Sequence, residues 1–334
     1  MSSGQGTPIY TEVPRLAAGS QESLDHLASE GFVVIKGALS PSEAEHALGL
    51  TWDYLEGLGT GIDRKNMATW ADDRWPIVTS GGIIPALGIG HSEAQWFTRS
   101  VPSIKKAFAS IWGDDDLLSS FDGMALWRPT DVDIEWEKTR GKSWLHIDQH
   151  PITRPGMHCV QGAVTLMPTS PSVGGNILIP KSHKWFAEIP ETYAERIGKL
   201  PAWLDHFRFP ADDARLRETP PIMAHMDAGD MMLWDSRTVH CSSPGIEPAS
   251  PSDPSAPSLI RAASLVCMMP RSKASEDVIA KRRAAVDAMV STTNWTDRFF
   301  STDDYPEMQA AEDLSRFALP PVPKLTEDQR ALVG

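Results

Sequence analysis

The chain has 334 residues, and its 31 Lys and Arg against 44 Asp and Glu give a formal net charge of −13. This length can bury a large core as one domain or two. The excess of acidic residues, with no basic run longer than Lys281-Arg282-Arg283, argues against nucleic-acid and anionic membrane partners and favours a small-molecule substrate.

The first eighteen residues are expected to form a flexible tail. They lack the basic and apolar regions of a signal peptide, and no apolar run in the chain approaches the length of a membrane span. The three cysteines are widely separated and include no C-x-x-C pair, which argues against a disulfide framework or a cysteine-zinc site. These features together indicate a reducing, cytoplasmic setting.

Two helices and a strand are predicted after the tail. Leu24, Leu27 and Ala28 share one helix face, and Gly31 marks the end of that helix before a buried strand at residues 32–35. The segment Ser40-Pro41-Ser42-Glu43 is a capping box with proline at the first helical position, so it predicts the start of a second helix.

Residues 57–103 are irregular and rich in tryptophan. A long segment of this kind inside a compact chain is typical of a lid or a binding loop. We therefore expect Trp70, Trp75 and Trp96 to supply an aromatic wall for the substrate, with packing in the core as the alternative. Arg128, on the strand that follows, is a further candidate for contact with the substrate.

The central part of the chain is predicted to be all-β. Short strand candidates alternate with turns rich in Pro, Gly and Ser, a texture typical of a sandwich or double-sheet jelly roll. Helical spacing returns after residue 271. We therefore expect one domain over residues 19–334, with helical and lid segments at 19–122, a jelly-roll core at 123–270 and a helical segment at 271–334. The strand candidates are residues 124–128, 144–148, 160–167, 176–179, 231–235 and 259–269.

The candidate metal site begins at His146-Ile147-Asp148. Residues i and i+2 of a strand point to the same face, so this imidazole and this carboxylate converge. One distant histidine would complete a 2-His-1-carboxylate triad with open positions on the metal, and His240 is the best candidate. A second His-x-Asp run, His225-Met226-Asp227, is a weaker alternative because only thirteen residues separate Asp227 from His240.

Three motifs in this order resemble the phytanoyl-CoA dioxygenase family of Fe(II)/2-oxoglutarate oxygenases. The resemblance covers roughly residues 23–270. The motifs are His146-Ile147-Asp148-Gln149, then Gly174-Gly175-Asn176 through Ser182-His183, then Gly229-Asp230 through His240.

The resemblance implies a cupin-like double-stranded β-helix in which His146, Asp148 and His240 hold Fe(II). It also implies that an arginine on a late strand, here Arg261, binds the distal carboxylate of 2-oxoglutarate, assisted by Ser242. Alternation along that strand places Arg261, Ala263, Leu265 and Cys267 on one face. Because a Pro/Ser-rich insertion precedes Arg261, Arg271 and Arg237 stay open as alternative anchors.

The implied activity converts 2-oxoglutarate and O2 into succinate and CO2 while an unactivated C–H bond of a small metabolite is hydroxylated or otherwise oxidised. Halogenation is disfavoured, since Asp148 occupies the ligand position that a halide would need. Two alternatives remain. The same fold could hold a Lewis-acidic metal for isomerisation or hydrolysis, since zinc also accepts two histidines and a carboxylate, or it could be a binding module stabilised by metal.

Overall fold

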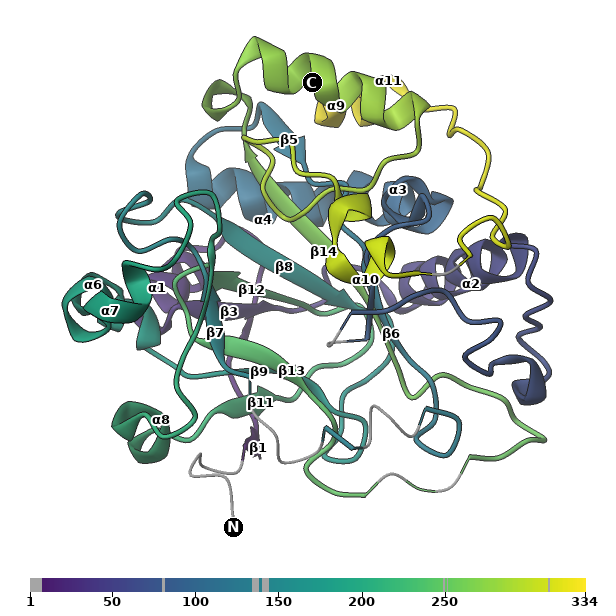
Figure 1. Ribbon diagram of the computed structural model, residues 1–334, viewed down its shortest axis with the longest axis horizontal. Coiled ribbons are helices and arrows are strands. Elements are labelled where there is room, and N and C mark those ends of the chain that lie inside the picture. Colours follow the sequence, from purple (N-terminus) through teal and green to yellow (C-terminus); the bar gives the residue numbers. More distant parts are fainter. Residues whose placement is uncertain are drawn as a thin grey trace.

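Two facing β-sheets form the centre of the computed structural model, which describes residues 8–79, 82–133, 138–139, 144–248, 250, 252–311 and 313–334 (Figure 1). The smaller sheet has the strand order β1 (Ile9–Thr11), β11 (Ile222–Ala224), β9 (Gly175–Leu178), β13 (His240–Ser243), β7 (His146–Asp148) and β10 (His206–Arg208). The larger sheet has the order β2 (Arg15–Leu16), β3 (Phe32–Ile35), β12 (Met231–Asp235), β8 (Val160–Thr165), β14 (Arg261–Pro270), β6 (Met124–Trp127) and β4 (Ile83–Ile84), and β5 (Leu117–Ser119) pairs with β14. Among the described strands neither sheet closes into a barrel, and the expected jelly roll is confirmed as an open two-layer structure.

The six predicted strand runs correspond to β6, β7, β8, β9, β12 and β14. Four strands of the smaller sheet were not predicted, namely β1, β10, β11 and β13. Each has only three or four residues, which is too short for an alternating pattern to stand out from the surrounding loops. Their place in the sheet depends on partners that are distant in sequence.

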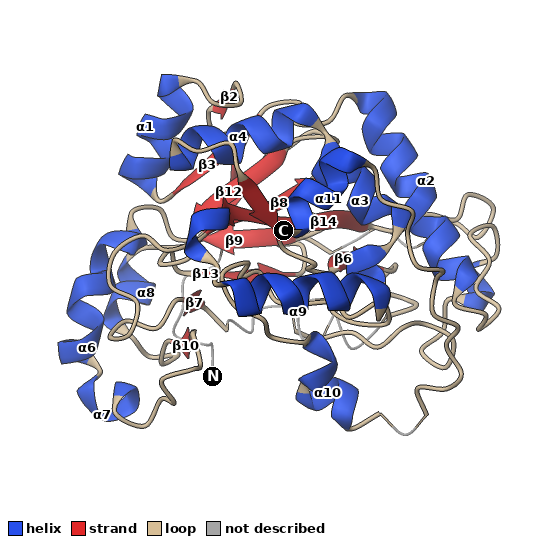
Figure 2. Cartoon of the chain, turned by 90° about the horizontal axis from the view of Figure 1, so that it is seen from above, coloured by secondary structure: helices blue, strands red, loops and turns tan. Residues whose placement is uncertain are grey.

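Helices cover the outer face of the larger sheet (Figure 2). Helix α1 packs on β3, α3 and α4 pack on β14, and α11 packs on β5. No helix within the described ranges is long and apolar enough to cross a membrane. The α-helices are α1 (Gln21–Glu30), α2 (Pro41–Gly57), α3 (Glu93–Ser100), α4 (Pro102–Trp112), α6 (Ile189–Thr192), α7 (Ala194–Ile197), α8 (Ala214–Glu218), α9 (Glu276–Asp287), α10 (Pro306–Gln309) and α11 (Glu327–Val333). The 3-10 helices are η1 (Met67–Thr69), η2 (Ile89–His91), η3 (Ser182–Glu188), η4 (Arg271–Lys273) and η5 (Thr302–Asp304).

The predicted helix boundaries follow from local chemistry. Gly31 ends α1 with a φ of 82°, a left-handed conformation that glycine adopts without steric cost. The side chain of Ser40 accepts from the backbone N–H of Glu43, and the carboxylate of Glu43 accepts from the backbone N–H of Ser40. This reciprocal capping box starts α2 as predicted.

The described part of the N-terminal segment, from residue 8 onward, is not the flexible tail that we expected. Residues Ile9–Thr11 pair in parallel with β11 of the smaller sheet, and Arg15–Leu16 pair in parallel with β3 of the larger sheet. Strands of two and three residues carry no detectable period, so the sequence pattern could not reveal them. The segment from residue 8 onward therefore joins the edges of both layers.

Residues 57–103 are also more regular than predicted. Strand β4 pairs with β6, and α3 begins where the side chain of Ser92 accepts from the backbone N–H of Gln95. The Ser-x-x-Gln pattern at this point is itself a capping-box signal that could have revealed the helix. Within this segment, α3 packs against α2, α4 and β14, and β4 packs against β6.

Strand β3 shows how the core divides into two layers. Val33 and Ile35 belong to the large apolar cluster that also includes residues of α2 and α4. Phe32 and Val34 point to the opposite face and pack in a cluster that contains residues of both sheets. The space between the sheets is therefore apolar beside β3.

His91, at the end of η2, gives the fold a measurable pH dependence. Its Nε2–H donates to the carbonyl of Val290 over 2.9 Å, and burial lowers the pKa of this histidine from 6.5 to about 3. Because the unfolded chain takes up the proton first, this contribution to stability is present above pH 6.5 and is lost as pH falls towards 3.

In His91→Gln the free energy of unfolding should therefore depend less steeply on pH than in the unaltered protein. The expected difference in slope is about 1.4 kcal/mol per pH unit between about pH 6 and pH 4. Urea unfolding at several pH values measures both slopes. Equal slopes in the two proteins would contradict the neutral, buried state of this histidine.

Candidate active site

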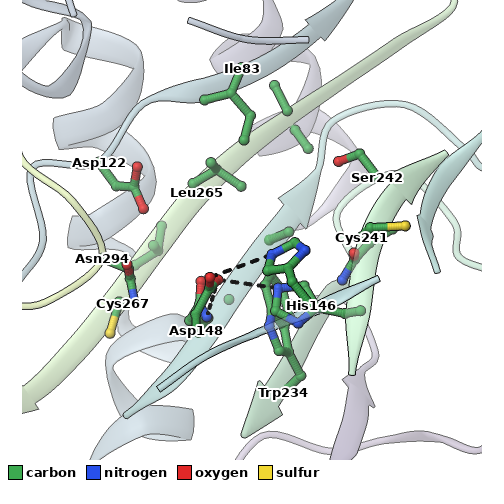
Figure 3. A pocket seen from close by; sticks show the side chains of 18 of the residues that line it. Ile83, Asp122, His146, Asp148, Trp234, Cys241, Ser242, Leu265, Cys267 and Asn294 are labelled. Carbon is green, nitrogen blue, oxygen red and sulfur yellow. Dashed lines mark hydrogen bonds and ion pairs between the residues drawn. The ribbon is translucent and has the colours of Figure 1, made fainter. Parts of the chain in front are cut away.

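His146, Asp148 and His240 meet on two neighbouring strands of the smaller sheet (Figure 3). His146 on β7 lies directly opposite His240 on β13 in the antiparallel pair. The Nε2 atom of His146 is 3.4 Å from Oδ1 of Asp148, and the Nε2 atom of His240 is 3.3 Å from Oδ2. The three prospective ligand atoms all lie within 4.8 Å of one another. This set is the only such cluster found among the described residues.

Both histidines are held in the tautomer that metal binding requires. Nδ1 of His146 lies 3.0 Å from the carbonyl of Trp144, and Nδ1 of His240 lies 2.9 Å from the carbonyl of Thr238. A carbonyl oxygen only accepts, so Nδ1 carries a proton in each ring and Nε2 is the nitrogen left for a metal. Backbone carbonyls of this kind orient histidine ligands in metal sites.

The charge states in the cluster also suit a cation. Burial lowers the pKa of His146 to about 4, against the opposing charge of Asp148, so this ring is neutral at pH 7. Burial acts to raise the pKa of Asp148, but the neighbouring imidazoles of His146, His206 and His240 outweigh it and hold that pKa well below its usual range. One ionised carboxylate and two imidazole nitrogens form a donor set typical of divalent iron or zinc.

Three further side chains support the cluster and were not predicted. Gln161 of β8 donates from Nε2 to Oδ2 of Asp148 over 3.1 Å, and the Trp144 ring stacks on His146 at 4.8 Å. His206 of β10 lies opposite Asp148 in the strand pair, with Nδ1 3.4 Å from Oδ1 of the carboxylate. The contacts of Gln161 and His206 connect different strands, so only the fold reveals them, whereas Trp144 lies just two residues before His146.

The rival His225–Asp227 pair lies elsewhere. Nδ1 of His225 is 2.7 Å from the hydroxyl of Tyr10, and Asp227 forms an ion pair with Arg15. The Asp227 side chain is 59% exposed, and neither residue of the pair belongs to the three-ligand cluster. The geometry therefore favours His146 and Asp148, rather than His225 and Asp227, as the metal-binding pair.

Arg261 lines the same cavity as the three ligand residues but comes from β14 of the larger sheet. Its side chain is buried, and its Nε and Nη1 atoms have no hydrogen-bond partner among the described residues. Burial lowers its pKa to about 9, so the guanidinium still carries its charge at pH 7. Its one recorded aromatic contact is the Trp127 ring, 4.3 Å from the guanidinium carbon. A buried cation in this state calls for an anionic ligand.

The two alternative arginine anchors are already paired. Arg237 donates from Nε and Nη2 to the carboxylate of Asp235, and Arg271 donates from Nε to Asp116 over 2.9 Å. Neither lines the cavity. The predicted alternation along β14 holds, since Arg261, Ala263, Leu265 and Cys267 all face the cavity.

The remaining predicted residues divide between the cavity and the core. Ser242 of β13 lines the cavity two residues after His240. Trp70, Trp75 and Trp96 are instead buried in the main apolar cluster, because their segment packs beneath the helical layer. The tryptophans that line the cavity within the described part of the chain are Trp127, Trp144 and Trp234.

Arg128 likewise differs from its predicted role. Its Nη2 atom is 2.8 Å from carboxylate oxygens of both Asp72 and Asp133, and its Nη1 donates to the carbonyl of Trp70 over 2.7 Å. Its side chain is buried and does not line the cavity. These contacts tie the strand end to the preceding segment, which is a structural function.

The chain is similar to known proteins over much of its length. The family model described as phytanoyl-CoA dioxygenase (PhyH) matches residues 27–246. "Ava biosynthesis cluster protein O" of Aspergillus versicolor is 30% identical over 286 residues, covering 82% of this chain and 86% of that protein. A "putative phytanoyl-CoA dioxygenase" of Dictyostelium discoideum is 28% identical over 127 residues, covering 36% of this chain and 34% of that protein.

Among solved structures, EctD from S. alaskensis with 2-oxoglutarate and 5-hydroxyectoine has 15% sequence identity and a TM-score of 0.47, with 80% of this chain and 81% of that chain covered. Family membership does not depend on this likeness. It depends on the extent of the family match and on the identity to the Aspergillus protein. The chain therefore belongs to the phytanoyl-CoA dioxygenase family of non-haem iron, 2-oxoglutarate-dependent oxygenases.

Proposed function

We propose that this enzyme hydroxylates an unactivated C–H bond of a small metabolite, with 2-oxoglutarate and O2 converted to succinate and CO2. One oxygen atom enters the new hydroxyl group and the other enters succinate. The observation that carries the proposal is Arg261, a buried guanidinium in the same cavity as the His-Asp-His cluster, with donors that no described residue pairs. An isomerase or hydrolase has no need of this cation, whereas an enzyme that binds a dicarboxylic co-substrate needs a cation to pair with its distal carboxylate.

The two sheets would contribute different parts of the reaction. His146, Asp148 and His240 hold iron on the smaller sheet, and the bound metal supplies oxidation of the C–H bond by dioxygen, coupled to decarboxylation of 2-oxoglutarate. On the larger sheet, Arg261 binds the distal carboxylate of 2-oxoglutarate by charge-assisted hydrogen bonds. Ser242, two residues beyond His240, is placed to donate a further hydrogen bond to that carboxylate.

Apolar side chains that line the rest of the cavity would limit the access of water to the site. Ala263 and Leu265 of β14 and Trp127 of β6 form an apolar wall beside Arg261. Such walls strengthen the pairing of Arg261 with an anion, since charges interact more strongly where water is excluded. They also protect the oxidising centre from side reactions with solvent.

The primary substrate is proposed to be a small metabolite of a biosynthetic pathway. The Aspergillus relative, which the chain matches over most of its length, carries the name of a biosynthesis cluster, and this supports a role in secondary metabolism.

Production of succinate tests the proposal. The protein incubated with Fe(II), 2-oxoglutarate and air should form succinate, and removal of the metal with a chelator should stop it. Mass spectrometry of the labelled succinate formed under 18O2 would show one incorporated oxygen atom. Succinate formation that needs neither iron nor oxygen would refute the proposed function.

A further inference from the structure

A third charged side chain, Asp122, lines the cavity together with Asp148 and Arg261 and has no part in the functions described above. It lies in the turn between β5 and β6, and its carboxylate points into the cavity, toward the side on which Asp148 lies (Figure 3). The one hydrogen bond that its carboxylate receives from the described residues comes from the backbone N–H of Gly123, over 2.7 Å. Its second oxygen is therefore available to a ligand.

Buried polar side chains fix this turn in place. Nε2 of Gln95 donates to the carbonyls of Asp122 and Gly123, each over 2.7 Å, and to that of Leu265 over 3.2 Å. Arg99, which is fully buried, donates to the carbonyls of Gly90 and Asp122 and not to the carboxylate. The guanidinium therefore orders the backbone and leaves the acid without a direct ion pair.

Gly123 closes the turn tightly. A Cβ at this position would lie 2.0 Å from the carbonyl oxygen of Ile84, so no other residue fits without a shift of the backbone. The direction of the Asp122 side chain is thus set by the fold before any ligand binds, which is the condition for tight recognition at low entropic cost.

Asp122 lies at the opposite end of the cavity from the anion anchor. The backbone N–H of Leu265 donates to the carbonyl of Gly123, so the turn sits beside Leu265. Arg261 precedes Leu265 by four residues on β14, which is roughly 13 Å along an extended strand. The cavity therefore has a cationic end for 2-oxoglutarate and an anionic end that repels it.

The acid is strongly affected by its surroundings. Burial raises the pKa of Asp122 to about 7, while the Gly123 N–H and the charge of Arg99 lower it and the charge of Asp148 raises it further. Two carboxylates thus influence each other within one cavity. A cationic group of a ligand would offset the charge of Asp122, whereas a neutral hydroxyl would leave it uncompensated.

We infer that Asp122 binds the primary substrate through a protonated nitrogen, an ammonium or a guanidinium group. Leu265 and Ile83 supply apolar contact at this end of the cavity, and the amide of Asn294 supplies a polar one. This inference rests on the proposed function, because it assigns the substrate end of the same cavity. The charged group would be fixed by Asp122 and the carbon to be oxidised would extend toward the metal ligands.

The test uses matched ligands on the holoenzyme. The protein is loaded anaerobically with Fe(II) and 2-oxoglutarate, so that no turnover occurs, and is titrated by calorimetry with benzylammonium, benzylguanidinium or benzyl alcohol. At least one cation should bind at millimolar concentration or better. Asp122→Asn, which keeps an acceptor for the Gly123 N–H, should weaken that binding about tenfold or more, since hydrogen bonds between charged groups contribute most. The weaker binding of benzyl alcohol should not change.

Two variants serve as controls. Asp303→Asn removes the same charge from η5, outside the cavity lining, and should bind every ligand as the unaltered protein does. Asn294→Asp adds a carboxylate to the same end of the cavity and should strengthen binding of the cations. This second variant keeps the test decisive even where Asp122→Asn fails to fold.

Three results would overturn the inference. In the first, neither cation binds. In the second, a cation binds the unaltered protein and Asp122→Asn with equal affinity. In the third, Asn294→Asp does not raise the affinity for the cations. None of them bears on the proposed function, because the titration excludes oxygen and succinate formation is measured separately. Loss of succinate formation with intact cation binding would instead refute the oxygenase proposal and leave Asp122 as a cation site.

Discussion

Replacement of Asp148 by alanine is expected to reduce conversion of 2-oxoglutarate to succinate by about 1,000-fold or more. The variant loses the one anionic ligand of the cluster and leaves only the two imidazoles to hold the metal. Metal-ion catalysis contributes several kcal/mol to the reaction barrier, and each 1.4 kcal/mol corresponds to about tenfold in rate. Iron bound per protein, measured after gel filtration, should fall together with succinate formation.

The second His-x-Asp run supplies the matched control. Asp227→Ala changes the same residue type in the same motif, at a position whose contacts are with Arg15 and His225 rather than with the cluster. This variant should bind iron normally and retain its rate within about twofold, since a lost surface hydrogen bond affects stability by only about 1 kcal/mol. Equal losses in the two variants, or full activity in Asp148→Ala, would show that the metal lies elsewhere.

Replacement of Arg261 by methionine should raise the KM for 2-oxoglutarate about 100-fold. The buried carboxylate of the co-substrate would lose its charged partner, a change that costs about 2–5 kcal/mol at comparable sites. Arg261→Lys should recover part of the loss, because lysine keeps the charge but cannot present the planar two-donor fork. Initial rates of succinate formation over a range of 2-oxoglutarate concentrations separate KM from kcat.

Arg271→Lys is the control for the anchor. Arg271 contacts Asp116 at the surface and is 30% exposed, and its substitution should leave the KM for 2-oxoglutarate unchanged. A KM that rises equally in this variant, or one that barely moves in Arg261→Met, would show that a different residue binds the co-substrate. The family match ends at residue 246, so the assignment of Arg261 depends on the structure more than on that match.

The sequence predicted the parts of the site that follow from local periodicity. His146 and Asp148 share a face because side chains alternate along a strand, and Arg261 faces the cavity for the same reason. The direct pairing of His146 with His240 could not be derived, since it depends on the register between strands almost a hundred residues apart. His206 and Asp122 escaped notice because neither belongs to a motif, and each reaches the site through the strand or turn beside it.

The errors also have a physical origin. Trp70, Trp75 and Trp96 lie in a segment that suggested a lid, yet large aromatic side chains contribute most where they are fully buried, and these three pack in the core. Arg128 was predicted to contact the substrate because it is a cationic residue on a strand near the predicted site. Its two aspartate partners, Asp72 and Asp133, flank it from separate segments, and only folding brings them together.

The division of the site between two sheets has a consequence for how the family can diversify. The iron ligands and Ser242 belong to the smaller sheet, whereas Arg261 and the Asp122 turn belong to the larger one or its border. Substitutions on β14 or in the turn can therefore alter which acid or which substrate is selected while the metal ligands keep their mutual geometry. Conversely, 2-oxoglutarate bound as proposed would be held by both layers and would act as a non-covalent cross-link between them, so its binding should raise the melting temperature beyond the effect of iron alone.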